Sequence, residues 1–443
     1  ILNREEFLMK TLLKNFTIVT MNENLDVLKD AHLIVEDGKI TDVATGAATG
    51  TFDEVIDGQN RQVLMPGLVN THCHVPMVLM RGYGGHDLNT WLNQYIFPVE
   101  DKLTSQSIRA GTALGVAEMI ASGITSFADM YYFCDDMAEV TLEAGLNLNL
   151  SRGTTVFTPL DDPAAFAPCQ EAIALAEKWN GANNGQIKID FSIHGEYTSF
   201  LSPNLWDYLA GYASEHHLGM HVHVSETKAE HEECKVRHGG LTPLQVLDAH
   251  GVWTGTRGMA AHCVWTEPED WKLMAERGIS VLHCPTSNLK LGSGIAPVPS
   301  LMAAGVNVAL GTDGMSSHNS ADLFSDIKLA AVLHNGVERD PMAVSAWAAL
   351  EIATVNGARA LGRDTGVIAP GKTADLILAD LSAPNLIPCH DPVEDLVFSA
   401  HGSNVEMNMA RGQVIYEKGS FLTLDLERVR WEVEHYALPL IFG

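Results

Sequence analysis

The stretch Val63–His74, with the sequence VLMPGLVNTHCH, decides the fold of this chain. Its apolar run Val63–Asn70 is typical of a buried β-strand, and two histidines follow that run directly. Because side chains alternate along a strand, His72 and His74 face one side and Cys73 faces the other. Two imidazoles on one face are a ready pair of metal ligands, so a metal site is expected where this strand ends.

Seven further apolar runs follow this one, and helical stretches alternate with them. This alternation is the pattern of βα units around a parallel sheet. Eight strands with intervening helices favour a closed barrel over an open sheet, so we predict an α/β protein with a (β/α)8 TIM barrel. The expected strands are Val63–Asn70, Ile124–Asp129, Leu146–Ser151, Ile187–Ile193, Met220–Val224, Gly258–Cys263, Ser280–Cys284 and Asn307–Gly311.

The sequence pattern at both ends of the chain differs from that of the middle and predicts short strands joined by tight turns. His32–Val35 and Ile40–Val43 flank an Asp-Gly pair, which is a strong hairpin signal. Val405–Ala410 and Gln413–Tyr416 repeat the pattern across an Arg-Gly pair, after a further strand at Ala374–Ala379. These segments predict one small β-sandwich domain built from both termini. The expected boundaries are 1–64 and 366–443 for the β-sandwich, and 65–365 for the catalytic barrel.

Composition narrows the range of functions. With 443 residues, 46% of them hydrophobic, the chain can bury a large core without cross-links, and its seven cysteines form no disulfide framework. A formal net charge of −27 disfavours nucleic acid and anionic membranes as partners. Residues 1–8 are charged and lack the apolar core of a signal peptide, so we expect a cytoplasmic protein with its natural start at Met9.

Ionisable residues also follow other predicted strands. They are His223 and Glu226 after the fifth strand, His262 after the sixth, and Asp313 after the eighth. Catalytic groups of barrel enzymes come from the carboxyl ends of several strands, so these side chains are expected to converge with the histidine pair of the first strand. His221 lies one layer deeper on the same face of the fifth strand, and we expect it to be a hydrogen-bonded core residue.

The motifs at these strand ends resemble those of a known family. His72-Cys73-His74 after Pro66–Asn70, His223 with Glu226, His262, and Asp313 are similar to the motifs of the mononuclear branch of the amidohydrolase superfamily. Accessory motifs recur at His283–Leu291, Thr354–Arg363 and Gly371–Asp375, so the resemblance covers nearly the whole chain. It implies a barrel with a β-sandwich built from both termini, in agreement with the strand pattern.

The resemblance implies a role for each residue. The metal ligands are expected to be His72, His74, His223 and Asp313, and the catalytic groups Glu226, His262 and Asp313. In this interpretation Glu226 protonates the substrate ring, His262 stabilises developing charge, and Asp313 accepts a proton from water. Binuclear relatives carry a bridging lysine at the end of strand four, where this chain has His194; Lys188 lies at that strand's start. We therefore expect one divalent ion per chain, with Zn²⁺ preferred and Fe²⁺ as the alternative.

Two other motifs are rejected. Residues Gly366–Thr373 have the spelling of a Walker A loop, but they follow a helix-like segment and open a strand, which is the reverse of a phosphate loop. The signature of zinc nucleobase deaminases requires Cys-x-x-Cys, and the sequence contains no such spacing. Any deaminase chemistry is therefore expected on the barrel fold.

Within the superfamily, the chain most resembles the methylthioadenosine/S-adenosylhomocysteine deaminases. This resemblance implies that Glu100 binds the ribose hydroxyls, Arg152 clamps the carboxylate of a substrate tail, and His194 holds the nucleoside, with Glu226 also touching the base. The loop Ser316–Asn319 departs from relatives, which often carry an Asn pair there. The implied function is hydrolytic deamination of adenosine, 5'-methylthioadenosine or S-adenosylhomocysteine to an inosine-type product and ammonia.

Two alternatives stay open. A guanine-type or s-triazine aminohydrolase or chlorohydrolase of the same superfamily uses the same metal set, but its pocket needs no ribose-binding carboxylate such as Glu100. A non-catalytic scaffold relative would have lost metal ligands, and this chain retains the full set. The expected partner is a small purine nucleoside, and a homo-oligomer is compatible with the sequence.

Overall fold

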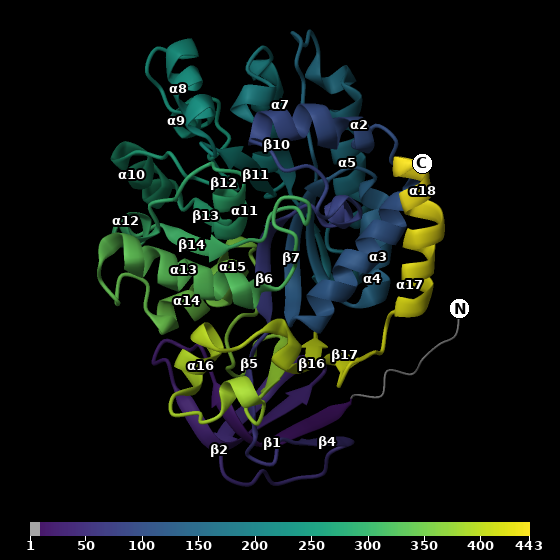
Figure 1. Ribbon diagram of the computed structural model, residues 1–443, viewed down its shortest axis with the longest axis vertical. Coiled ribbons are helices and arrows are strands. Elements are labelled where there is room, and N and C mark those ends of the chain that lie inside the picture. Colours follow the sequence, from purple (N-terminus) through teal and green to yellow (C-terminus); the bar gives the residue numbers. More distant parts are fainter. Residues whose placement is uncertain (1–8) are drawn as a thin grey trace.

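The computed structural model describes residues 9–443, so the expectations about residues 1–8 lie outside the described residues. Parallel strands from the middle of the chain form two sheets of four and five strands (Figure 1). The first sheet contains β6 (Leu68–Cys73), β7 (Ile124–Tyr131), β8 (Asn147–Arg152) and β9 (Ile187–Ile189). The second contains β10 (Phe191–Gly195), β11 (Gly219–Val224), β12 (Arg257–His262), β13 (Ser280–His283) and β14 (Asn307–Leu310).

Hydrogen bonds bring the two sheets together into the predicted barrel. At one junction, the Asp313 N–H donates to the His72 carbonyl oxygen over 2.9 Å, which links the end of β14 to β6. At the other, β9 and β10 follow each other with only Asp190 between them, and the Asp190 N–H donates to Leu150 of β8. β9 and β10 therefore occupy one strand position, and the chain has the eight positions of a (β/α)8 barrel.

The predicted first strand, Val63–Asn70, is wrong in its extent. The structure divides this run into β5 (Gln62–Pro66), which belongs to the terminal sheet, and β6, which belongs to the barrel. Gly67 separates them at a close approach, because a Cβ at this position would lie 2.2 Å from the Thr125 side chain. The apolar residues Val63–Pro66 of β5 and Leu68–Val69 of β6 are buried on either side of Gly67, so the apolar run does not mark the boundary between the two strands.

Both termini contribute to one nine-stranded sheet, as predicted. From the N-terminal part come β1 (Lys10–Val19), β2 (Val27–Glu36), β3 (Lys39–Thr45), β4 (Glu54–Asp57) and β5; from the C-terminal part come β15 (Leu376–Asp380), β16 (Val405–Ala410), β17 (Gln413–Glu417) and β18 (Ser420–Phe421). The predicted hairpins β2–β3 and β16–β17 are confirmed as antiparallel pairs. Figure 1 shows this sheet below the barrel, and it encloses a core of its own that includes Phe16, Leu33 and Leu64.

Helices surround the barrel strands. They are α3 (Ser105–Ala121), α4 (Cys134–Ala144), α5 (Ala167–Trp179), α7 (Pro203–Glu215), α8 (Lys228–Arg237), α9 (Pro243–Ala249), α10 (Pro268–Arg277), α11 (Pro285–Lys290), α12 (Val298–Ala303), α13 (Leu323–Glu338), α14 (Ala346–Ala353) and α15 (Val355–Ala360). Among residues 9–443, no helix combines the length and the apolar character that crossing a membrane requires.

Two irregular helical segments lie outside this regular pattern. The first, which we call the cap segment (residues 83–102), contains α1 (Leu88–Trp91), a π-helical turn (Leu92–Ile96) and α2 (Phe97–Glu100). The second follows β18 and contains α17 (Leu426–Glu432), a π-helical turn (Val433–Ala437) and α18 (Leu438–Phe442).

The second segment runs beside the barrel helix α3 (Figure 1). It therefore packs on the barrel although it lies within residues 366–443, which we assigned to the β-sandwich. The domain boundaries themselves stay a prediction.

Candidate active site

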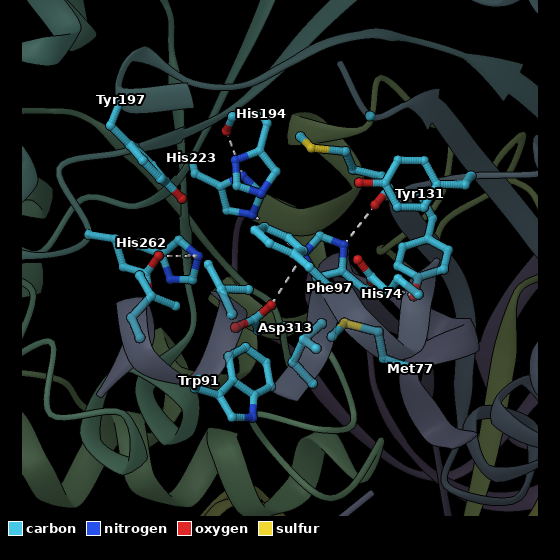
Figure 2. A pocket seen from close by; sticks show the side chains of 18 residues that line it. His74, Met77, Trp91, Phe97, Tyr131, His194, Tyr197, His223, His262 and Asp313 are labelled. Atoms are coloured by element: carbon cyan, nitrogen blue, oxygen red, sulfur yellow. Dashed lines mark hydrogen bonds and ion pairs between the residues drawn. The ribbon is translucent and has the colours of Figure 1, made fainter. Parts of the chain in front are cut away.

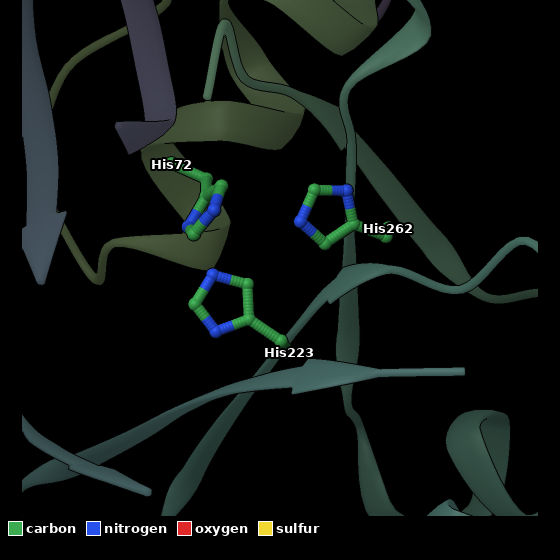
Figure 3. A group of neighbouring side chains, drawn as sticks. All are labelled: His72, His223 and His262. Atoms are coloured by element: carbon green, nitrogen blue, oxygen red, sulfur yellow. The ribbon is translucent and has the colours of Figure 1, made fainter. Parts of the chain in front are cut away.

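The ionisable residues expected to converge do lie together at the carboxyl ends of the barrel strands. The ligand atoms of His72, His223 and His262 all lie within 4.8 Å of one another, and the same holds for His72, His74 and Asp313. Figure 3 shows the rings of His72, His223 and His262 gathered around a common centre. Three strand-end residues here have left-handed backbone, namely Ser225, His262 and Asp313, with φ of 50°, 71° and 65°. Such local strain is common at functional sites.

The hydrogen bonds of His74 and His223 leave two nitrogen lone pairs facing each other. The Nδ1 of His74 lies 2.7 Å from the Met130 carbonyl oxygen, and the Nδ1 of His223 lies 2.6 Å from the His194 carbonyl oxygen. A carbonyl oxygen only accepts, so both Nδ1 atoms carry the proton in the neutral rings and both Nε2 atoms carry a lone pair. These Nε2 atoms are 3.4 Å apart, an arrangement that a cation between them would stabilise.

His72 and Asp313 complete this cluster. Burial lowers the pKa of His72 to about 3, so its ring is neutral, and its Nε2 has no hydrogen-bond partner in the described chain. The Oδ1 of Asp313 lies 3.6 Å from this atom and 3.3 Å from the Nε2 of His74. Three neutral imidazoles and a carboxylate that converge in this way fit a divalent metal ion.

Neighbouring side chains hold these groups in place. His221 lies behind His72, with its Nε2 2.8 Å from the Nδ1 of His72, so the expected core histidine contacts a candidate ligand directly. The hydroxyl groups of Ser287 and Ser317 donate to the Oδ2 of Asp313 over 2.5 and 2.9 Å. Contacts of this kind orient metal ligands and fix the tautomer of a histidine.

Glu226 and His262 form the adjacent part of the site. The Nε2 of His262 lies 3.8 Å from the Oε2 of Glu226, while its Nδ1 hydrogen-bonds to the Oδ1 of Asn288 over 2.8 Å. Burial raises the pKa of Glu226, which favours a carboxyl group that carries a proton. Burial lowers the pKa of His262, but the carboxylates of Glu226 and Asp313 raise it overall. The pair can therefore hold and transfer a proton.

A buried carboxylate, Glu230, fixes the loop that carries Glu226. It accepts hydrogen bonds from the N–H groups of Ser225 and Glu226, both over 2.8 Å. It also completes a capping box with Thr227 at the start of α8.

A cavity opens in front of these groups. His74, His223, Glu226, His262 and Asp313 line one side of it. Residues of the cap segment and aromatic side chains line the rest; Figure 2 shows Trp91, Phe97, Tyr131 and Tyr197 among them. A mixture of apolar walls with a few polar groups is typical of a small-molecule site.

Three of the four predicted substrate-binding residues, Glu100, His194 and Glu226, line this cavity. Burial raises the pKa of Glu100 to about 7, and its Oε1 accepts a hydrogen bond from the Tyr131 hydroxyl over 2.6 Å. His194 lines the cavity beside His223, with ring centroids 4.6 Å apart, and burial lowers the pKa of His194 to about 3. A carboxyl group and a neutral imidazole can both exchange hydrogen bonds with substrate hydroxyls.

Arg152 does not line this cavity. Its Nε donates to Glu171 over 2.7 Å, and its guanidinium group lies over the Tyr132 ring, 5.0 Å from the centroid. Arg152 instead lines a neighbouring cavity, and Tyr132 lines both cavities. The guanidinium group thus stands behind the substrate cavity, on the far side of Tyr132.

Sequence reasoning missed the cap residues and the residues that hold the ligands. Trp91 and Phe97 lie in a segment without a clear period, so nothing in the pattern identified them as cavity residues. Ser287 and Asn288 lie within the accessory motif His283–Leu291, and that motif was the available signal for them.

A (β/α)8 barrel with His and Asp side chains gathered at its strand ends defines a metal-dependent enzyme. The sequence profile of the amidohydrolase family matches residues 63–415, and the chain belongs to that family, whose members depend on metal. The candidate metal site in the described residues agrees with this membership.

Individual relatives cover almost the whole chain. It is 40% identical over 392 residues to a 5-methylthioadenosine/S-adenosylhomocysteine deaminase of Dictyoglomus thermophilum, covering 88% of this chain and 90% of the relative. It is 39% identical over 434 residues to a 5'-deoxyadenosine deaminase of Methanosarcina acetivorans, covering 97% and 98%. A crystal structure of an adenosine deaminase from Xanthomonas campestris with bound zinc superposes with a TM-score of 0.91 at 31% identity, covering 98% of each chain.

Proposed function

We propose that this protein is a metal-dependent hydrolytic deaminase of adenine nucleosides, which forms the inosine-type product and ammonia. The observation that carries the proposal is the metal-ligand cluster that shares one cavity with the carboxyl groups of Glu226 and Glu100. The similarity to nucleoside deaminases over nearly the full chain supports the same class of substrate.

In this proposal His72, His74, His223 and Asp313 hold one divalent ion per chain, with Zn²⁺ preferred over Fe²⁺. The fourth strand supports a single ion, because His194 stands at its end and the Nζ of Lys188 donates to the Gly362 carbonyl oxygen at its start. Elemental analysis of protein reconstituted with zinc should give about one ion per chain. Two ions per chain would contradict the assignment.

The proposed reaction adds water to the ring carbon that bears the amino group, and the bond to that amino group breaks as ammonia leaves. A bound divalent cation supplies Lewis acidity and lowers the pKa of water at the site. Glu226 gives a proton to the adjacent ring nitrogen, since burial favours its protonated form, and it regains a proton from the added hydroxyl group as ammonia leaves. Asp313 accepts a proton from water and passes it to the departing amine, and His262 stabilises charge on the attacking oxygen.

Substrate recognition is assigned to two parts of the cavity wall, one on the cap segment and one beside the metal ligands. Glu100 is proposed to bind the ribose hydroxyls, and His194 to hold the nucleoside next to the metal ligands. Arg152 is proposed to reach only a long 5'-substituent, because Tyr132 stands between its guanidinium group and the cavity.

Ammonia release from a panel of compounds tests the function. We expect zinc-loaded protein to deaminate adenosine, 5'-methylthioadenosine and S-adenosylhomocysteine far faster than free adenine, with loss of the adenine absorbance band. Faster turnover of guanine or of an s-triazine than of every adenine nucleoside would favour the alternative substrate class. Metal-loaded protein that turns over no compound of the panel would contradict the function.

A further inference from the structure

Helix α18 lies against the cap segment, far from the metal-ligand cluster. The Phe442 ring packs against the Tyr83 ring with centroids 4.9 Å apart, and the Ile441 carbonyl oxygen accepts a hydrogen bond from the Nζ of Lys102 over 3.1 Å. Tyr83 and Lys102 stand at the two ends of the cap segment, so α18 contacts that segment where it begins and where it ends. Ile441 itself is fully buried.

The contact at Tyr83 leads directly to the substrate cavity. The Tyr83 carbonyl oxygen accepts a hydrogen bond from the indole Nε1 of Trp91 over 3.2 Å, and Trp91 lines the cavity. Gly84 makes the turn between them with φ of 74°, and a Cβ there would lie 3.0 Å from Trp91 and 3.1 Å from Tyr95. Phe442, Tyr83 and Trp91 therefore form a continuous path of contacts from α18 to the cavity wall.

Few long-range hydrogen bonds hold the cap segment in place. In the part of the chain that the structure describes, two hydrogen bonds join it to residues distant in sequence, namely Lys102 to Ile441 and Tyr131 to Glu100. Six residues of the cap segment line the cavity: Leu88, Trp91, Leu92, Ile96, Phe97 and Glu100. Trp91, Ile96 and Val99 also anchor the segment in the hydrophobic core. Because its long-range hydrogen bonds are few, each contact at its two ends influences its position.

We infer that α18 positions the cap segment over the substrate cavity, and that Phe442 and Lys102 are positioning residues for substrate binding. The inference rests on the proposed function only in its choice of substrate. When the Phe442 ring is absent, the cap segment opens more often, and the open form binds the nucleoside more weakly. The groups that act on the substrate ring are not disturbed, so the effect falls on KM and not on kcat.

Hydrogen exchange and kinetics of three single variants test this inference. Phe442→Ala removes the aromatic contact, Lys102→Met removes the hydrogen bond, and Trp431→Ala is the matched control. Trp431 is an exposed aromatic residue of the same helical segment, and its ring stacks on that of His435 with the centroids 5.2 Å apart. Phe442 is 42% exposed, so its replacement is not expected to impair folding.

In Phe442→Ala, amide exchange in peptides covering residues 84–102 should rise roughly two- to tenfold, the range for loss of one aromatic pair. KM for adenosine should rise by a similar factor, while kcat stays within about twofold. Lys102→Met should show a smaller change in the same direction, and Trp431→Ala should match the parent.

Unchanged exchange in residues 84–102 of both variants would overturn the inference, as would raised exchange with an unchanged KM. The exchange measurement needs no substrate. It therefore gives its answer even if the protein turns over no nucleoside, and a failure of the proposed function remains distinguishable from a failure of this inference.

Discussion

The two sides of the substrate cavity are built on opposite principles. On the metal side, the candidate ligands come from barrel strands, and each is tied by a further hydrogen bond, as His74 is to Met130 and His223 to His194. On the cap side, the lining residues come from two four-residue helices that flank a π-helical turn. Two long-range hydrogen bonds hold that segment.

This difference indicates a division of labour. The reacting groups must be held in a fixed geometry, because preorganised charges act without reorganisation at the moment of reaction. The groups that admit and cover the substrate must move, and they lie on short irregular helices with few long-range hydrogen bonds. Changes on the metal side should therefore reduce kcat strongly, and changes on the cap side should act mainly through substrate affinity.

The largest effect is expected for Asp313→Ala, on the metal side. The variant loses a charged ligand and leaves the hydroxyl group of Ser287 without its acceptor. Bound metal should fall well below one ion per chain, and kcat should fall about 10³-fold or more, since the Lewis acid contributes several kcal/mol. Elemental analysis and ammonia release measure the two effects.

Asp364→Ala is the matched control for that experiment. Asp364 is an exposed carboxylate that pairs with Lys39 and Lys372, away from the cavity. The Asp364→Ala variant should keep both its bound metal and its deaminase activity. Full metal content in Asp313→Ala would show that Asp313 is not a metal ligand and would contradict the proposed ligand set.

The next effect separates proton transfer from metal binding on the same side of the cavity. Glu226→Gln should keep its metal, because Glu226 is not a proposed ligand. Turnover should drop about 10²- to 10⁴-fold, the contribution of a general acid or base. Glu232→Gln, which changes an exposed carboxylate on α8, should behave like the parent. Near-normal kcat in metal-loaded Glu226→Gln would assign the proton to another group.

The third effect belongs to the cap side. Glu100→Ala should raise KM for adenosine and cost about 1.5–3 kcal/mol in kcat/KM, the scale of a hydrogen bond to a charged group. Residual activity on free adenine should not change, since adenine has no ribose. An equal loss for adenine and adenosine would show that Glu100 does not recognise the ribose.

A pH profile sharpens the same test. Burial raises the pKa of Glu100 to about 7. The carboxylate that we propose as the acceptor for both ribose hydroxyls is therefore present above this pH and is lost as the pH falls through about 7. KM for adenosine should rise below pH 7 in the parent, and this rise should be absent from Glu100→Ala.

The contrast between the two sides also explains how much could be predicted from the sequence. The barrel and the convergence of His72, His74, His223 and Asp313 follow from local patterns, because strand period and strand ends are visible in one stretch of chain. The boundary at Gly67 could not be predicted, since the apolar run continues through two strands of different sheets.

Other parts depend on contacts between distant segments. The interruption at Asp190 between β9 and β10 arises from its side chain, which accepts hydrogen bonds from Asn149 and from the Gly219 N–H. The position of Trp91 depends on Tyr83 and, through it, on Phe442. No periodic pattern encodes either arrangement, because each depends on tertiary packing and not on local propensity.

The smallest effect is expected for Arg152→Ala, and it should depend on the substrate. The Arg152 guanidinium group already pairs with Glu171 and lies outside the lining of the main cavity, beyond Tyr132. Adenosine has no group that extends past Tyr132, so its kcat/KM should stay within about twofold. S-adenosylhomocysteine carries an amino-acid carboxylate that can replace Glu171 as the partner of Arg152. Because the substrate carboxylate then only replaces that of Glu171, the net gain in binding free energy is small. We therefore expect Arg152→Ala to lower kcat/KM roughly tenfold or less, and for this substrate alone.

Steady-state kinetics on the two substrates, with Glu171→Gln measured in parallel, test whether Arg152 binds the substrate tail. If Arg152 must leave Glu171 to bind the tail, Glu171→Gln should improve kcat/KM for S-adenosylhomocysteine and leave adenosine unchanged. Equal losses for both substrates in Arg152→Ala would instead mean that the arginine acts on the shape of the cavity through Tyr132, which lines it. That result would make Arg152 part of the fixed wall and remove the proposed clamp on the substrate tail.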